Sequence, residues 1–151
     1  MKRISFIFII VVVTFSSLIS YAQESTYFVL GENQLSNTSI YSVCETKNDL
    51  VYIGTDQGLF VYQHGSFVHI LGAEEQHGNS LFNLKVNNEG DLFCGNLRGQ
   101  IFKLVDNKLE LFYALPKKAI GLDLRYEFDN KNHLLIASFR QCVSLDSSGV
   151  P

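Results

Sequence analysis

The chain has 151 residues, including 12 Phe and 7 Tyr, and 18% of its residues are charged. This length predicts one domain at most, and the aromatic content is that of a globular chain, which excludes a disordered tail. The net charge of −3 comes without any basic stripe, so the electrostatic surface of a nucleic-acid-binding protein is excluded too.

The N-terminus has the three-part pattern of a secretory signal peptide. Lys2 and Arg3 precede an uncharged, apolar run of about 17 residues, and the small residue Ala22 closes the segment. We expect residues 1–22 to be cleaved near Ala22, leaving residues 23–151 periplasmic or secreted with 10 basic and 15 acidic residues. The alternative is an uncleaved segment retained as a membrane anchor, because the run is near the lower length limit of a spanning helix.

A repeat of about 41 residues organises the rest of the chain. The segment "VYIGTDQGLFVY" (51–62) aligns with "LFCGNLRGQIFK" (92–103) at an offset of 41 residues, which places Gly54 on Gly95. The segment "LLIASFRQCVSL" (134–145) continues the series at an offset of 42 residues. A period of this length is typical of propeller and solenoid repeats.

The segments upstream of these strands repeat at the same offsets. "IYSVCE", "LFNLKV" and "DLRYEF" align so that Tyr41, Phe82 and Leu124 are equivalent. Each segment leads to a polar turn, "TKND", "NNEG" or "DNKN", which is hairpin chemistry. Gly54 and Gly58 bracket a tight connection that requires positive φ or close backbone approach.

These patterns predict an all-β chain that folds as a partial β-propeller of about three four-stranded antiparallel blades. The repeats run over about 35–74, 75–116 and 117–151. The expected strands are about 39–45, 50–54, 58–63, 66–70, 80–86, 91–95, 99–105, 108–113, 121–128, 133–137 and 141–145. The alternative is an ordinary β-sandwich whose strands are similar by accident.

The first copy resembles the propeller repeats of bacterial two-component regulators. It has the lead-in "LSN" at 35–37, the central "VYIGT" at 51–55 with Tyr52 where tryptophan is usual, and "GLFVY" at 58–62. The second copy departs from this pattern at Cys94 and Asn96. The third loses both glycines, to Ala137 and Gln141.

The resemblance implies the periplasmic sensor region of a sensor or hybrid histidine kinase. In such proteins the propeller precedes an immunoglobulin-like module, a membrane helix and a cytoplasmic kinase, and many respond to carbohydrate or other extracellular ligands. Propellers need 4–8 blades, so about three copies indicate a fragment of a longer sensor, or a partial propeller completed by another chain or by self-association. The end in mid-copy favours the fragment.

No catalytic, metal or cofactor site is expected. His64 and His69 flank one strand on opposite faces, His77 lies in the acidic loop "GAEEQHGN", and His133 precedes a strand, so none completes a metal-ligand pattern. A propeller glycosidase or lyase stays open as an alternative. It would need paired carboxylates, for which Asp56 and Asp123 are the only candidates.

The three cysteines, Cys44, Cys94 and Cys142, lie in apolar, strand-like runs at spacings of 50 and 48 residues. These spacings match no metal-binding pattern, so we expect buried thiols. Export would permit one disulfide, and the odd count leaves at least one thiol free.

The candidate ligand-binding residues are Arg98 and Arg140, which occupy equivalent connections where the first copy has Gln57. Repeated polar residues at one end of a propeller channel can line a ligand site, and the alternative is a pair of solvated turn residues. The ligand-binding hypothesis predicts that Arg98→Ala weakens ligand capture without unfolding the chain. The expected function is thus an extracytoplasmic sensor segment that binds a small molecule or glycan, with a protein-interaction propeller as the alternative.

Overall fold

The computed structural model describes residues 28–117, 124–138 and 141–151. The chain divides into two compact units, Met1–Leu30 and Gly31–Pro151, and every described strand belongs to the second. The expected signal peptide lies outside the described residues. Within the described ranges, no helix is long and apolar enough to cross a membrane.

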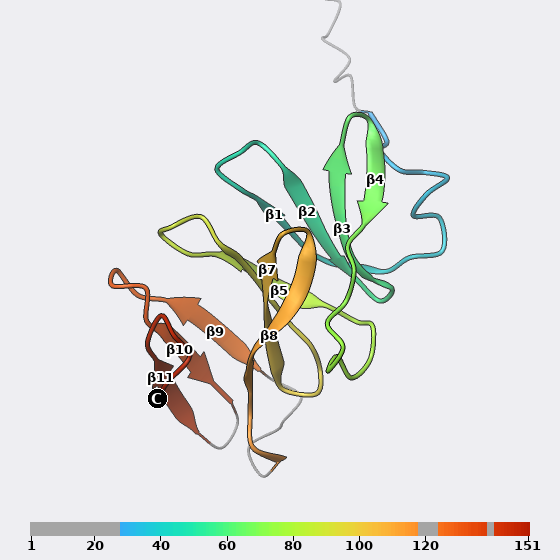
Figure 1. Cartoon of the computed structure of the whole chain (residues 1–151). Helices are drawn as coiled ribbons and strands as arrows, with labels where there is room; N and C mark the ends of the chain where they lie inside the picture. The colour runs from blue at the N-terminus through green and yellow to red at the C-terminus, as the bar shows by residue number, and fades with distance from the viewer. Residues whose placement is uncertain (1–27, 118–123, 139–140) are drawn as a thin grey trace, which may run out of the picture. The chain divides into compact units, whose positions relative to one another are not determined.

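The strands of Gly31–Pro151 form three separate antiparallel sheets that follow one another along the chain (Figure 1). The first sheet has the order β1-β2-β3-β4, the second β5-β6-β7-β8 and the third β11-β10-β9. The bounds are β1 Ile40–Glu45, β2 Val51–Thr55, β3 Gly58–Gln63, β4 Ser66–His69, β5 Phe82–Val86, β6 Leu92–Gly95, β7 Gln100–Val105, β8 Lys108–Ala114, β9 Arg125–Phe128, β10 Leu134–Ala137 and β11 Cys142–Leu145.

The all-β prediction is confirmed, and the strands predicted from the repeat are found within a few residues of their expected bounds. The first two copies each give a four-stranded sheet, whereas the third gives three strands among the described residues. The prediction of four strands in each blade is therefore met in the first two copies.

The second sheet contributes to two hydrophobic clusters, one shared with each neighbouring sheet. Leu84 and Phe102 of the second sheet pack in one cluster with Tyr52 and Leu59 of the first. Its other cluster joins the third sheet, and the members of that cluster are Phe93, Ile101, Leu115, Leu124, Tyr126, Leu134, Ile136 and Leu145. Burial of apolar surface between successive sheets is therefore the main favourable contribution to folding.

Two glycines allow successive sheets to approach closely. A Cβ atom added to Gly54 of β2 would lie 2.6 Å from Leu84 Cδ1 and 2.7 Å from the Leu81 carbonyl oxygen, both from the second copy. A Cβ added to Gly95 of β6 would lie 3.2 Å from Tyr126 Cε1 of the third sheet. The glycine of one sheet thus accepts a large side chain from the first strand of the next.

The tight connection after Gly54 and its repeat after Gly95 also have the expected chemistry. Gly58 and Gly99 have φ angles of +124° and +75°, which glycine adopts without a steric penalty. The buried Asn96 holds the second of these turns, because its Oδ1 accepts hydrogen bonds from the backbone nitrogens of Arg98 (2.9 Å) and Gln100 (3.1 Å). These side-chain bonds satisfy backbone donors that the turn leaves outside the sheet ladder.

Candidate functional site

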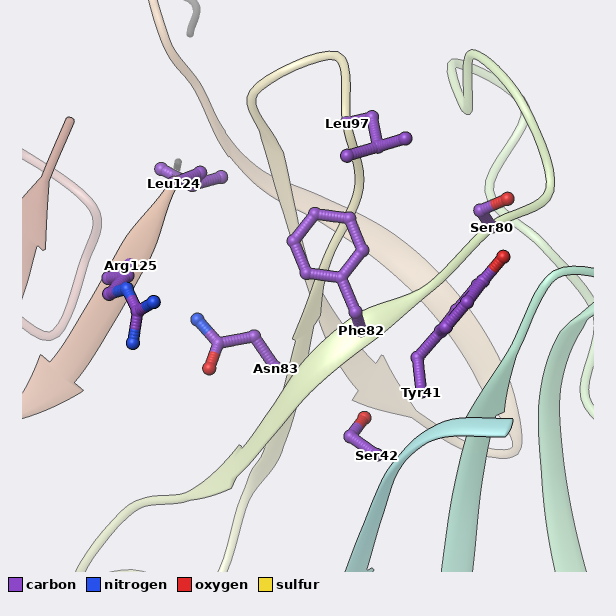
Figure 2. A pocket seen from close by; sticks show the side chains of 8 residues that line it. All are labelled: Tyr41, Ser42, Ser80, Phe82, Asn83, Leu97, Leu124 and Arg125. Carbon is purple, nitrogen blue, oxygen red and sulfur yellow. The ribbon is translucent and has the colours of Figure 1, made fainter. Parts of the chain in front are cut away.

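An open pocket of about 480 Å³ lies where the first strands of the three sheets begin. Strand β1 lies beside β5, and β5 lies beside β9. The residues that line the pocket are Tyr41, Ser42, Ser80, Phe82, Asn83, Leu97, Leu124 and Arg125. Figure 2 shows the Phe82 ring near the centre, with Tyr41 on one side and Asn83, Leu124 and Arg125 on the other. Its volume is that of a site for a small organic molecule.

The same two repeat positions of every copy line this pocket. The first position holds Tyr41, Phe82 and Leu124, and the offsets of 41 and 42 residues make Ser42, Asn83 and Arg125 the second. The pairing of strands agrees with these offsets in the first and third copies, where Ser42 pairs with Gly54 and Arg125 pairs with Ala137. In the second copy a bulge pairs Phe82 with Gly95 instead. The pocket therefore combines an apolar position and a polar position from each copy.

A β-bulge lets two consecutive residues of a strand line one pocket. The pairing of β5 with β6 shifts between Phe82 and Lys85, and that of β1 with β2 shifts between Ile40 and Ser42. Within the bulge of β5, Asn83 has a φ of +59°, in the left-handed region that asparagine tolerates better than most residues. Bulges commonly re-aim side chains next to functional sites.

The side chain of Asn83 carries an unsatisfied donor. Its amide nitrogen is buried and has no hydrogen-bond partner in the part of the chain that the structure describes. In Figure 2 the Asn83 amide extends from β5 toward Leu124 and Arg125. The backbone carbonyl of Asn83 is fixed separately, because it accepts a hydrogen bond from the hydroxyl of the buried Tyr126. An unpaired buried donor costs about 1–3 kcal/mol.

Arg125 is the one charged residue among the described residues that line the pocket, and these include no carboxylate and no histidine. The lining side chains offer amide and hydroxyl groups beside two aromatic rings. This set suits the orientation and binding of a polar molecule. The described lining residues include no pair of acids for glycoside hydrolysis, and the candidate Asp123 lies outside the described residues.

Of the two arginines predicted from the sequence, Arg98 is exposed in the turn between β6 and β7, next to the lining residue Leu97. Arg140 is outside the described residues. Gln57, their counterpart in the first copy, donates from its side chain to the carbonyl of Asn37 at 3.1 Å.

His69, His133 and Asp56 have structural contacts. His69 Nε2 lies 3.1 Å from the Gln57 carbonyl oxygen, and its ring packs edge-on against Phe60. His133 Nδ1 lies 2.9 Å from Asp129 Oδ2, and Asp56 Oδ1 accepts a hydrogen bond from the Ser39 nitrogen. No group of three His, Cys, Asp or Glu residues suited to a metal ion occurs in the described ranges.

The acidic loop around His77 is anchored by its backbone. The buried Gln100 donates to the Glu75 carbonyl at 2.7 Å and accepts from the His77 nitrogen at 2.9 Å. Asn96 donates to the His77 carbonyl at 3.2 Å. These bonds fix the path of the connection between the first and second sheets.

The three cysteines are free and differ in exposure. Cys94 is buried, Cys44 is half-buried and Cys142 is exposed, so the prediction of buried thiols is confirmed for Cys94 and wrong for Cys142. The face of β11 that carries Cys142 has no sheet packed against it among the described residues. Burial raises the pKa of the Cys94 thiol from 9.0 to about 12, and it also raises the pKa of Cys44, against the opposing charge of Lys85.

The sequence contained a signal for the pocket in its first strands, away from the repeated turn residues. Tyr41, Phe82 and Leu124 align as equivalent positions, and the residue after each one is polar in all three copies. In a regular strand consecutive side chains point to opposite faces, so this adjacency predicts no shared site. The bulge that brings both positions to the pocket is visible only in the structure.

The fold and the pocket define a class of protein: an all-β chain of repeated antiparallel sheets with a pocket where its first strands meet. No family model matches the sequence, and no curated protein matches it. Among solved structures, the chain is similar to the extracellular domain of a protein described as a putative one-component system from B. thetaiotaomicron. The TM-score is 0.56 and the identity 14%, over 72% of this chain and 17% of that one. The likeness shows a shared fold over a small part of the longer domain.

Proposed function

We propose that the chain is the ligand-binding part of an extracytoplasmic sensor, with its three sheets as blades of a β-propeller. The observation that carries the proposal is that the same two positions of each repeat line one pocket. Propellers place the first strands of their blades around a central channel, and such channels commonly hold ligand sites. The similarity to an extracellular domain supports this reading of the fold.

The proposed location outside the cytoplasm depends on the segment at residues 1–22. Its basic start, apolar run and small residues before Gln23 are those of a cleaved signal. Export from a bacterial host followed by mass measurement tests this step. A product that begins near Gln23 is expected, whereas a full-length product held in the membrane fraction would contradict cleavage.

The proposed ligand is a small polar molecule with at least one hydrogen-bond acceptor. The unpaired Asn83 amide is buried in the pocket, and a turn of this side chain would present its donor to a ligand. The rings of Tyr41 and Phe82 supply flat apolar surface beside it. A sugar, a short glycan or a small organic acid fits these features. The proposal assigns binding to this chain and no catalytic step.

Thermal melting of the exported protein against a panel of free sugars, short glycans, organic acids and amino acids tests the proposal. A binder is expected to raise the melting temperature, because it stabilises only the folded state. Calorimetry with that binder is then repeated on Asn83→Gly, which removes the amide and keeps the left-handed backbone. We expect affinity to fall about fivefold, the equivalent of about 1 kcal/mol for one hydrogen bond.

Asn107→Gly is the matched control for this substitution. Asn107 has a φ of +61° and is exposed in the turn between β7 and β8, outside the pocket. Removal of the Asn107 side chain is expected to leave the affinity for the ligand unchanged. If Asn83→Gly keeps full affinity and Arg98→Ala loses affinity, the ligand binds at the turns between strands, such as that between β6 and β7, and not in this pocket. A panel without any binder would contradict the proposal itself.

A further inference from the structure

The first strand of the first sheet exposes a row of side chains that the other two sheets bury. Val43 is 60% exposed, whereas its equivalents in the next two copies, Leu84 and Tyr126, are 6% and 4% exposed. Leu84 and Tyr126 are covered because each packs onto the preceding sheet. The first sheet thus presents the half of an interface that requires a preceding sheet.

The third sheet exposes the opposite half of the same interface. Leu135 is 42% exposed, whereas its equivalents Tyr52 and Phe93 are 5% and 3% exposed. Tyr52 and Phe93 are covered because the following sheet packs onto them. The third sheet therefore presents a surface of the kind that accepts a following sheet.

The residues at the centre of these two free surfaces are matched in size. In the two interfaces within the chain, Gly54 faces Leu84 and Gly95 faces Tyr126. Ala137 takes the place of the glycine in the third sheet, and Val43 takes the place of the large side chain in the first. The added Cβ of Ala137 leaves less room, and valine is smaller than leucine or tyrosine. The pair therefore fits the same geometry.

Polar contacts also join successive hairpin turns, and their donors occupy equivalent positions. Lys47 Nζ donates to the Asn88 carbonyl of the next sheet, and Asn88 Nδ2 donates to the Asp129 carbonyl at 3.3 Å. The third member of this series is Asn130, which has the same side-chain donor as Asn88 and is exposed. On the free surface of the third sheet, this donor is placed to reach the turn of a further sheet.

We propose that the third sheet of one copy of this chain packs onto the first sheet of a second copy, with Ala137 opposite Val43. Both interfaces within the chain establish this packing, and the contact between copies continues it. Because the two surfaces differ, the contact is head-to-tail, and two copies close a ring when each uses both surfaces. The ring has six sheets, within the range of 4–8 blades that closed propellers require.

Sedimentation velocity on the full chain, purified as the exported product, tests the proposal. We expect a single species of twice the chain mass at tens of micromolar. Ala137→Glu and Val43→Lys each place a charge on one free surface, and each is expected to weaken association at least tenfold. Both residues are exposed, so melting curves of the variants are expected to show folded protein.

Mixing the two variants distinguishes a head-to-tail contact from other modes. In a mixed pair, one contact joins the two introduced side chains, whose charges are opposite, and the other joins the native Ala137 and Val43. The dimer is therefore expected to return on mixing. The control Asn107→Glu, in the outer turn of the second sheet, is expected to leave the dimer intact.

Three results would overturn the proposal. A wild-type chain that is a folded monomer at these concentrations would show that a second copy does not cover the surfaces. An effect of only one of the two variants would indicate a symmetric contact through a single sheet. Failure of the mixture to recover the dimer would exclude the pairing of residues 137 and 43.

Discussion

Cys94 and Tyr126 are buried acids, and Cys94 lies close enough to Tyr126 to raise the pKa of its phenol. Burial is the main reason that the pKa of the Tyr126 phenol lies well above 10.0, and the nearby Cys94 and Cys44 thiols raise it further. Burial likewise raises the pKa of Cys94 to about 12. Both side chains are therefore neutral at physiological pH. Ionisation of Cys94 would disrupt the cluster between the first and second sheets, and ionisation of Tyr126 would disrupt the cluster between the second and third.

These shifts predict that the chain loses stability in alkali. An unfolded chain releases the Cys94 proton near pH 9.0, whereas the folded chain keeps it up to about pH 12. The stabilisation is therefore complete below pH 9 and falls as the pH rises toward 12. The free energy of unfolding falls by at most about 1.4 kcal/mol per pH unit for each such group. Urea denaturation between pH 7 and 11 measures the effect.

Cys94→Ala and Tyr126→Phe are the matched variants for this experiment. Each removes one ionisable group, so the free energy of unfolding is expected to fall less steeply between pH 9 and 11. Each also removes buried atoms, so each variant is expected to be less stable at neutral pH. An unchanged slope in both variants would assign the alkaline loss to other groups.

At the scale of elements, the glycines of β2 and β6 set how closely neighbouring sheets pack. Gly54→Ala introduces a methyl group 2.7 Å from the Leu81 carbonyl, a backbone atom that cannot move aside alone. We expect a loss of about 2–3 kcal/mol in the free energy of unfolding. Gly95→Ala meets only the Tyr126 ring edge, at 3.2 Å, and is expected to cost about 1 kcal/mol.

Chemical denaturation of both variants measures these losses, with Ala137→Gly as the control. Ala137 occupies the equivalent strand position on an exposed surface, so its change to glycine is expected to alter stability by no more than about 1 kcal/mol. A larger loss in Gly95→Ala than in Gly54→Ala would contradict the packing geometry described here.

The elements themselves were largely predictable from the sequence, because hydrophobic alternation and turn residues report local structure directly. The segments that align with "VYIGT", together with the turn glycines, predicted the sheets and their strand bounds. The pocket was less predictable, because it depends on bulges in β1 and β5 and on the left-handed backbone of Asn83. The exposure of Cys142 was missed because an apolar strand does not show whether another sheet covers it.

At the scale of the whole Gly31–Pro151 unit, the second sheet has a different role from the other two. Both of its faces are covered, by the cluster with Tyr52 and Leu59 on one side and the cluster with Tyr126 and Ile136 on the other. Opening the second sheet therefore disrupts both clusters, whereas opening the first or third disrupts one. Regions that lose the most contacts on opening have the highest local stability.

Hydrogen exchange is expected to reflect this arrangement. The amides of β6 and β7 should exchange most slowly, and those of β1 and β11 should exchange faster. Measurement on dilute protein, by mass spectrometry of peptides, separates this effect from protection by a second copy. Slowest exchange in β1 of the dilute protein would contradict a central role for the second sheet.

The equivalence of the pocket positions has a consequence for how ligand preference changes in evolution. A residue exchanged between the first and third copies meets equivalent strand pairing, because Ser42 pairs with Gly54 and Arg125 pairs with Ala137. The second copy differs, since Asn83 has a left-handed backbone within a bulge. Recombination between the first and third repeats of one gene can therefore move a serine or an arginine from one side of the pocket to another. A new preference then requires the exchange of existing parts and no new fold.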